Sequence, residues 1–197
     1  METKYCTWAY ESVPGAASFR TLSSRELSRD IDKGVSVAGR WPDDMSLRMN
    51  AERPKDILLV DSPFNIESVL VASPALRDFL QRQELPDLEF LPLQLLDHKG
   101  RVASDEYVVV QCCRVIDCID QSQSVFEWDG LDEPSMEGVE KAVFDPTKLA
   151  ADNRMFRPKY VPAEYVVRED LAQKLLNAGF DSVAFSREFF GDYELYE

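Results

Sequence analysis

Apolar and polar residues follow the clearest pattern between residues 57 and 116 and again between 165 and 186. Short apolar runs at 57–60 and 69–72 have the length of strands. A third run covers 88–93, with Pro92 expected at an edge or bulge because proline cannot donate to a β-ladder. Residues 106–116 form a longer run rich in β-branched residues, too continuous for an exposed strand. It therefore predicts a strand at the centre of a sheet.

Two segments carry apolar residues at the i, i+3, i+4 spacing of a helix, at 74–84 and at 169–178. Ser73 is a suitable N-cap for the first helix and Pro74 a suitable first residue, because proline has no N–H to leave unpaired there. Gly179 can adopt the left-handed conformation that ends the second helix. The pattern therefore predicts two short amphipathic helices.

Each helix lies between two apolar runs, and the spacing is similar in both cases. Val71 and Phe90 are 19 residues apart, and Val167 and Phe185 are 18 apart. We therefore predict two copies of a strand–helix–strand unit; chance similarity of two ordinary units is the alternative. The predicted fold is one α+β domain with a mixed or mainly antiparallel sheet. Its predicted core contains Leu76, Phe79, Leu80, Phe90, Val108, Val110, Leu171, Leu175, Phe180 and Phe185.

Residues 1–56 show weak periodicity and several glycines and prolines. A short strand is expected at 5–10, and a short helix is expected to open at 22–27 with Ser23 or Ser24 as its cap. We interpret residues 1–56 as an arm or cover packed on the core, with Trp41 as its anchor. Residues 57–197 are then the α+β domain proper, and the whole chain is one globular unit.

Acidic residues outnumber basic ones by 36 to 22, which gives a formal net charge of −14. Residues 101–197 carry ten bases and twenty acids, so most of the excess lies in this half. Such a chain repels nucleic acid and anionic membrane surfaces and attracts a basic partner. No run approaches the ~20 apolar residues of a membrane span. Acidity that serves solubility alone is the competing explanation.

Cysteine and histidine are too few and too scattered to predict a metal site or a catalytic centre. The four cysteines include no CxxC pair, and His98 is the single histidine. We expect buried free thiols in a reducing, cytoplasmic compartment, no metal and no cofactor. His98 has no nucleophile motif around it, and no glycine-rich phosphate loop occurs. We therefore expect no catalytic residues, although an acid-lined pocket with catalytic or ligand-binding activity is the alternative.

Residues 117–140 contain eight acids and no lysine or arginine, with aromatic residues interleaved. Exposed aromatic side chains ringed by charge are typical of a protein-binding surface. Here the predicted partner-binding residues are Asp120, Glu127, Trp128, Asp129, Asp132 and Glu133. In the alternative interpretation this is a solvated loop whose Trp128 folds back into the core. The bases Arg154, Arg157 and Lys159 would then pair with nearby acids.

Several segments together resemble one known family. They are 69–73 with Leu76 and Phe79–Leu80, then 88–93, 107–110, 115–120 with Ser124, and the tail from Phe156 through 166–185. The resemblance is to bacterial immunity proteins of polymorphic-toxin systems, formerly described as a domain of unknown function and including myxobacterial members. It covers about residues 57–186. It implies a cytoplasmic protein that binds and neutralises a cognate toxin, and it transfers no catalytic residues.

Overall fold

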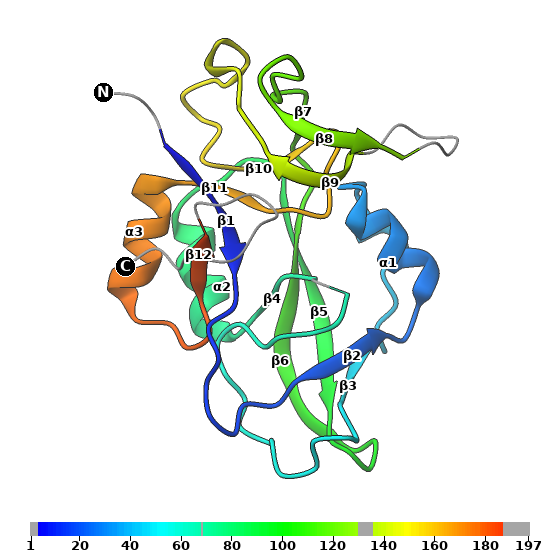
Figure 1. The fold of residues 1–197 in the computed structure, drawn as a ribbon. Helices are drawn as coiled ribbons and strands as arrows, with labels where there is room; N and C mark the ends of the chain where they lie inside the picture. The colour runs from blue at the N-terminus through cyan, green and yellow to red at the C-terminus, as the bar shows by residue number, and fades with distance from the viewer. Residues whose placement is uncertain (1–3, 68, 130–135, 187–197) are drawn as a thin grey trace.

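The computed structural model describes residues 4–67, 69–129 and 136–186, which form two five-stranded sheets, one two-stranded sheet and three α-helices (Figure 1). In spatial order the first sheet contains β12 (Ala184–Ser186), β1 (Tyr5–Ala9), β11 (Val166–Arg168), β10 (Met155–Pro158) and β7 (Val115–Ile116). The second contains β2 (Phe19–Leu22), β3 (Ser46–Met49), β5 (Leu88–Leu96), β6 (Val102–Cys112) and β4 (Val71–Ala72). The third contains β8 (Val125–Trp128) and β9 (Met136–Lys141).

The helices are α1 (Arg25–Asp32), α2 (Pro74–Arg82) and α3 (Glu169–Ala178), with single 3₁₀ turns at Ala38–Arg40 and Pro146–Lys148. Most strand pairs are antiparallel, but β3 pairs with β5 and β10 pairs with β7 in parallel. The predicted α+β class with mixed sheets is therefore confirmed. In the described part of the chain, the helices are all too short and too polar to cross a membrane.

Residues 107–112 of β6 are buried on both faces, as the continuous apolar run predicts, whereas 102–106 are exposed or partly exposed. Val108 and Val110 lie in a core between the two large sheets, whereas Tyr107 and Val109 lie in a second core beneath α1. The prediction is wrong about where this strand ends. It stops at Cys112, and Val115–Ile116 pairs with β10 in the other sheet. The hydrogen bond from Cys113 N–H to the carbonyl of Asp87 continues the register of the β5–β6 ladder, and the pairing ends there because Asp87 has a φ of +59° and is not extended.

Both strand–helix–strand units are present, and each is split by a strand from elsewhere in the chain. Strands β4 and β5 are each antiparallel to β6 and lie on either side of it, with α2 as the connection. Strands β11 and β12 flank β1 in the same way, with α3 as the connection. Figure 1 shows the two helices next to each other. The repeat is therefore confirmed, but the insertion of β1 and β6 between the strands of the two units was not predicted.

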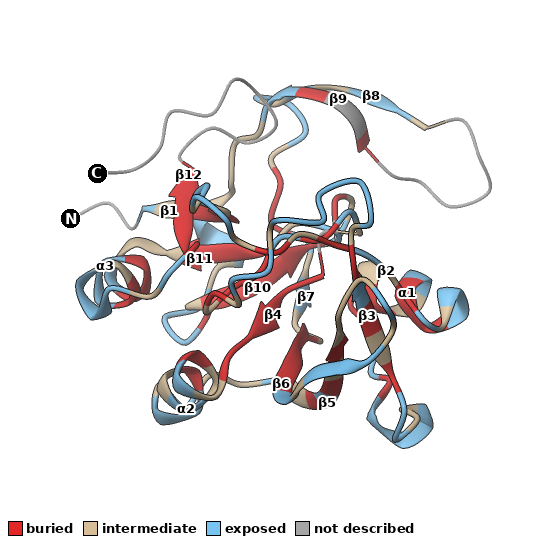
Figure 2. Ribbon diagram, turned by 90° about the horizontal axis from the view of Figure 1, so that it is seen from below, coloured by how far each residue is buried: buried red, intermediate tan, exposed pale blue. Residues whose placement is uncertain are grey.

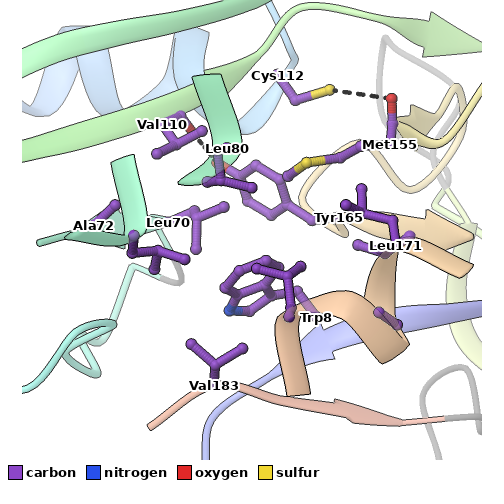
Figure 3. Packing of buried hydrophobic residues seen from close by; sticks show 14 of the residues in the cluster. Trp8, Leu70, Ala72, Leu80, Val110, Cys112, Met155, Tyr165, Leu171 and Val183 are labelled. Atoms are coloured by element: carbon purple, nitrogen blue, oxygen red, sulfur yellow. Dashed lines mark hydrogen bonds between the residues drawn. The ribbon is translucent and has the colours of Figure 1, made fainter. Parts of the chain in front are cut away.

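The two units face each other across one core, part of which is shown in Figure 3. Phe79 of α2 and Phe180, just after α3, meet edge to face with ring centroids 5.3 Å apart. Seven of the ten predicted core side chains are buried and the three phenylalanines Phe79, Phe90 and Phe180 are partly buried against the same core. Burial of these faces is the main stabilising contribution.

Local signals at the helix ends are confirmed. The Ser73 hydroxyl accepts a hydrogen bond from the backbone N–H of Leu76 at 3.2 Å, and Pro74 begins α2. Gly179 ends α3 with φ of +70°, a conformation that costs glycine little. Helix α1 begins directly after Ser24, one of the two predicted cap positions, but the Ser24 side chain makes no capping hydrogen bond.

The apolar run 57–60 is not a strand, contrary to the prediction. Ile57 and Leu58 are 64% and 49% exposed, and Leu58 makes only an isolated bridge to Ala16. Val60 alone of the four is buried, and its carbonyl accepts the Tyr107 hydroxyl at 3.0 Å. The strand prediction is wrong here because the run has the composition of a strand but no neighbouring strand with which to form a ladder.

Residues before 57 supply β1 to one large sheet and β2 and β3 to the other. The strand expected at 5–10 is thus confirmed, and β1 lies between β11 and β12. Trp41 packs against the core beneath α1, and its Nε1 donates to the carbonyl of Pro92 at 2.7 Å. Pro92 lies where β5 is paired with β6 but not yet with β3, so it occupies a local edge.

Candidate functional site

The β8–β9 ribbon stands apart from the large sheets (Figure 2). A small apolar cluster holds it to the body of the protein. The cluster consists of buried Ile119, Met136, Val139 and Val161, with Phe126, Ala142, Phe144 and Tyr160 packed against it. Met136 N–H also donates to the carbonyl of Tyr160 at 2.9 Å, so β9 is the strand next to the body and β8 is the outer strand. An isolated two-stranded ribbon is marginal in water, and this cluster is what stabilises it.

Trp128 lies on the ribbon and is neither fully exposed nor buried in the core, the two alternatives that the sequence left open. Its ring meets Phe126 at 5.1 Å and Tyr160 at 5.3 Å, both edge to face. It is nevertheless 46% exposed. One side of the indole is therefore fixed by aromatic contacts, while the other remains available to solvent. A partly immobilised aromatic ring loses less side-chain entropy when it is covered by a partner.

The predicted acidic residues of the ribbon differ in their surroundings. Glu127 is exposed and next to Trp128 in β8, so the two side chains point to opposite faces of the ribbon. Asp129 is partly buried at the end of the strand. Asp132 and Glu133 lie outside the described residues. The structure thus brings Glu127, Trp128 and Asp129 together on one projecting element.

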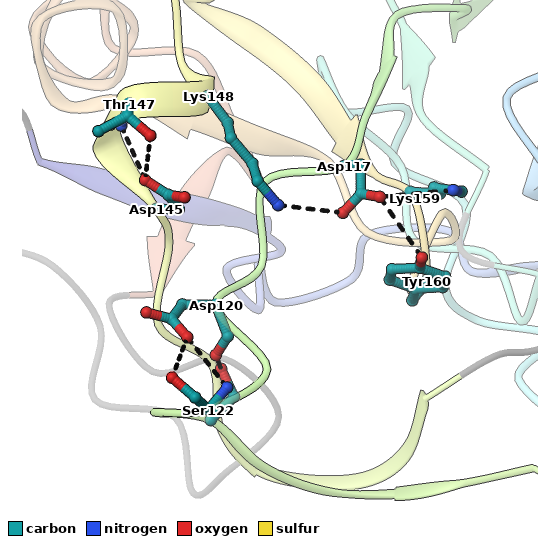
Figure 4. A network of polar contacts seen from close by, with 9 residues as sticks. Asp117, Asp120, Ser122, Asp145, Thr147, Lys148, Lys159 and Tyr160 are labelled. Atoms are coloured by element: carbon teal, nitrogen blue, oxygen red, sulfur yellow. Dashed lines mark hydrogen bonds and ion pairs between the residues drawn. The ribbon is translucent and has the colours of Figure 1, made fainter.

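Asp120 has a structural role at the base of this region. Its carboxylate accepts hydrogen bonds from the Ser122 hydroxyl at 2.7 Å, the Ser122 N–H at 2.9 Å and the Gln123 side chain at 2.6 Å (Figure 4). These donors, chiefly the Ser122 hydroxyl, lower the pKa of Asp120. The carboxylate therefore holds the turn that leads into β8.

The acidic stretch is partly neutralised at its start. Asp117 lies 3.7 Å from Lys148 Nζ and 3.4 Å from Lys159 Nζ, and it accepts the Tyr160 hydroxyl at 3.4 Å (Figure 4). These partners are exposed, so each pair contributes little to stability. The hydrogen bond to Asp117 nevertheless helps to position Tyr160, whose ring contacts Trp128.

The three bases proposed as internal partners behave differently. Arg154 lies 3.4 Å from Asp170, and Lys159 pairs with Asp117, as expected. Arg157 is 1% exposed and donates to the carbonyls of Cys112 and Pro162 and to the side chain of Gln111. Its guanidinium carbon lies 3.8 Å from the centre of the Tyr165 ring. Arg157 is thus a buried structural residue that does not screen the ribbon.

His98 and Cys112 lie at opposite ends of β6. His98 is in the turn before the strand, with its Nε2 3.2 Å from the Arg53 carbonyl. Cys112 ends the strand, about 33 Å away at the usual rise per residue. Burial raises the pKa of the Cys112, Cys113 and Cys118 thiols, which disfavours the reactive thiolate. In the described part of the chain, no three His, Cys, Asp or Glu side chains are placed to hold a metal ion.

A pocket of about 340 Å³ lies on another surface and was missed by sequence reasoning. Its walls include Tyr10, Val60 and Phe64, with Arg53 and Asp56 also lining it. Among the residues that the structure describes, burial raises the pKa of the carboxyl groups of Asp32 and Glu164, and neither lines this pocket. The carboxylates of Glu11 and Asp56 and the guanidinium of Arg53 are among the charged groups that line the pocket. The sequence feature that could have indicated this pocket is the run of small residues at 14–18.

Comparison with known proteins gives one family. The model of the immunity protein family Imm11 matches residues 13–187, which is most of the chain. No curated protein matches the chain. The match begins well before residue 57, so it includes β2, β3 and α1 as well as the two split units.

Proposed function

Because the chain belongs to the Imm11 family of immunity proteins, we propose that it binds a cognate protein toxin in the cytoplasm and neutralises it by contact rather than by catalysis. The partner is expected to present a basic surface. We place the contact on the β8–β9 ribbon and the residues that follow β8. The proposed binding residues are Asp120, Glu127, Trp128, Asp129, Asp132 and Glu133.

The observation that carries this proposal is the half-exposed Trp128 on a projecting ribbon. Apolar side chains that remain accessible on such an element favour a docking role over a core role. Roughly 100 Å² of the indole remains to be covered, which corresponds to about 2.5 kcal/mol at ~25 cal/mol per Å². That value is in the range of a binding hot spot.

Charge supports the same surface. Glu127 and Asp129 flank Trp128 in the sequence, Lys141 is the one base among residues 125–141, and Lys148 and Lys159 pair with Asp117. A basic toxin surface would reduce the repulsion among the acids and would be steered toward the ribbon. The acids are therefore expected to act mainly on the association rate and Trp128 mainly on the dissociation rate.

Neutralisation can be tested in bacterial cells that express the toxin domain encoded next to the gene for this chain. Co-expression of the chain should restore growth, and the purified pair should form a complex. Failure of both results would contradict the proposed function. Complex formation with no growth would show binding without neutralisation, which also contradicts it.

Matched variants locate the surface. Glu127→Lys and Glu106→Lys make the same charge change at two exposed strand glutamates, but only Glu127 is on the ribbon. Trp128→Ala and Phe64→Ala remove two aromatic rings of similar exposure, 46% and 47%. We expect the ribbon variants to weaken the complex and the others to leave it unchanged. The reverse order would place the interface on the surface that contains Phe64.

A further inference from the structure

The outer edge of β8 is unpaired in the described structure. β8 forms a two-stranded sheet with β9, and β9 is the strand attached to the body through Tyr160. In an antiparallel pair, alternate residues direct their N–H and C=O groups away from the partner strand. Half of the backbone groups of Val125–Trp128 therefore point outward from the ribbon.

The edge of β8 is regular enough to accept another strand. The register of the β8–β9 pair shifts between Val125 and Glu127. From Val125 to Glu127 β8 advances two positions, whereas the paired residues of β9, 141 and 137, are four positions apart, so the extra residues lie on β9. β8 itself contains no proline and no lysine, the residues that commonly protect exposed edges. Its side chains also divide cleanly by face. Phe126 and Trp128 share one face with Tyr160, and Val125 and Glu127 lie on the other.

The charge on this edge selects one kind of occupant. Residues 125–141 contain six acids and one base, a net charge of −5. A second copy of this chain would bring the same charge and would be repelled, since like charges directly opposite in a ladder are destabilising. A strand with lysine or arginine facing Glu127 would instead form a favourable cross-strand pair.

We infer that the cognate toxin adds a basic β-strand to the outer edge of β8, extending the two-stranded sheet to three strands. Backbone hydrogen bonds to β8 give the register, a basic side chain lies opposite Glu127, and an apolar side chain covers Trp128. This inference rests on the proposed function and specifies how the ribbon binds. It differs from a purely electrostatic contact because it requires main-chain pairing.

A synthetic peptide of alternating lysine and valine provides a probe that does not depend on knowing the toxin. Amide hydrogen exchange of the full chain, followed by NMR, first identifies the fast-exchanging amides of 125–128. Peptide at about 5 mM, above an expected Kd of roughly 1 mM, should slow those amides severalfold. A peptide with glutamate in place of lysine should have no effect.

Two chain variants complete the test. Glu127→Lys should reduce peptide affinity at least fivefold, whereas Glu106→Lys should leave it unchanged. Peptide binding without slowed exchange at β8, binding that ignores Glu127→Lys, or no binding at all would overturn the inference. Growth rescue by the chain without protection at β8 would refute the strand addition alone. Loss of growth rescue with protection still present would refute the proposed toxin function alone.

Discussion

Substitution of Arg157 by methionine is expected to destabilise the fold strongly. The guanidinium donates from Nε to the Cys112 carbonyl at 3.1 Å and from Nη2 to the Gln111 side chain at 3.1 Å, and it also donates to the Pro162 carbonyl. Methionine keeps most of the apolar stem but removes all of these donors. It also removes the cation that lies over Tyr165.

The size of this effect follows from burial. Arg157 is 1% exposed, so water cannot replace the lost donors without opening the structure. Leaving a buried acceptor without a partner costs about 1–3 kcal/mol, and Arg157→Met removes the donor of three of them: the Cys112 carbonyl, the Pro162 carbonyl and the Gln111 side chain. We therefore expect the Arg157→Met variant to lose about 3–5 kcal/mol, a large part of the ~5–15 kcal/mol of a typical domain. Arg157→Lys, which keeps the charge but loses the planar fork, should lose less.

The loss should also depend on pH. Burial raises the pKa of Asp32 and of Glu164, and the charge of Arg157 partly offsets that increase. Without Arg157 both pKa values rise further in the folded state. A raised folded-state pKa gives stability that is complete below the unfolded value, near ~4, and is lost as pH rises through the folded value. The difference between wild type and Arg157→Met should therefore widen as pH increases from about 4 to 7.

Urea denaturation followed by tryptophan fluorescence measures this difference, since Trp8 is buried in the main core. The free energy of unfolding should be determined for wild type, Arg157→Met and Arg157→Lys at several pH values. A loss below about 1 kcal/mol would refute the reasoning that the network is essential. A large loss independent of pH would refute the coupling to Asp32 and Glu164.

Three further predictions test other parts of the account. Gly34→Ala should destabilise the protein by more than about 1 kcal/mol in thermal unfolding, because φ is +69° and a Cβ would lie 2.5 Å from Val115 Cγ2; an unchanged melting temperature would contradict the packing described. Ser73→Ala should cost about 1 kcal/mol in urea denaturation through loss of the cap on α2, and Ser73→Asn should recover part of it. Glu164→Gln should stabilise the protein more at pH 8 than at pH 4.5, because burial raises the pKa of this carboxyl and the ionised form is disfavoured; equal stability changes at both pH values would contradict this.

Local features were predictable from the sequence and long-range pairing was not. Helices α2 and α3 and the cap at Ser73 depend on residues within one or two turns, and all were predicted. Insertion of β1 between β11 and β12 joins residues more than 150 positions apart, and no short pattern encodes such a partner. The run at 57–60 failed for a related reason: its composition suits a strand, but no ladder is available to it.

The candidate site was predicted in part. The aromatic and acidic content of 117–140 was evident, but the sequence did not distinguish an exposed Trp128 from a buried one. The structure gives an intermediate answer, because Tyr160 supports one side of the ring from a distant part of the chain. The burial of Arg157 was also missed, since arginine is rarely fully buried without a paired acid. Gln111 lies on β6 and Tyr165 lies directly before β11, and both approach Arg157 only after folding.

Kinetics of toxin binding test the central claim most directly. Association and dissociation rates should be measured at two salt concentrations for wild type, Trp128→Ala and a variant with charge reversal at Asp129, Asp132 and Glu133. We predict that Trp128→Ala increases the dissociation rate by about 30- to 100-fold, corresponding to about 2–2.7 kcal/mol. Charge reversal should slow association and flatten its salt dependence. Unchanged rates for both variants, with a lower melting temperature for Trp128→Ala, would contradict a binding role for the ribbon.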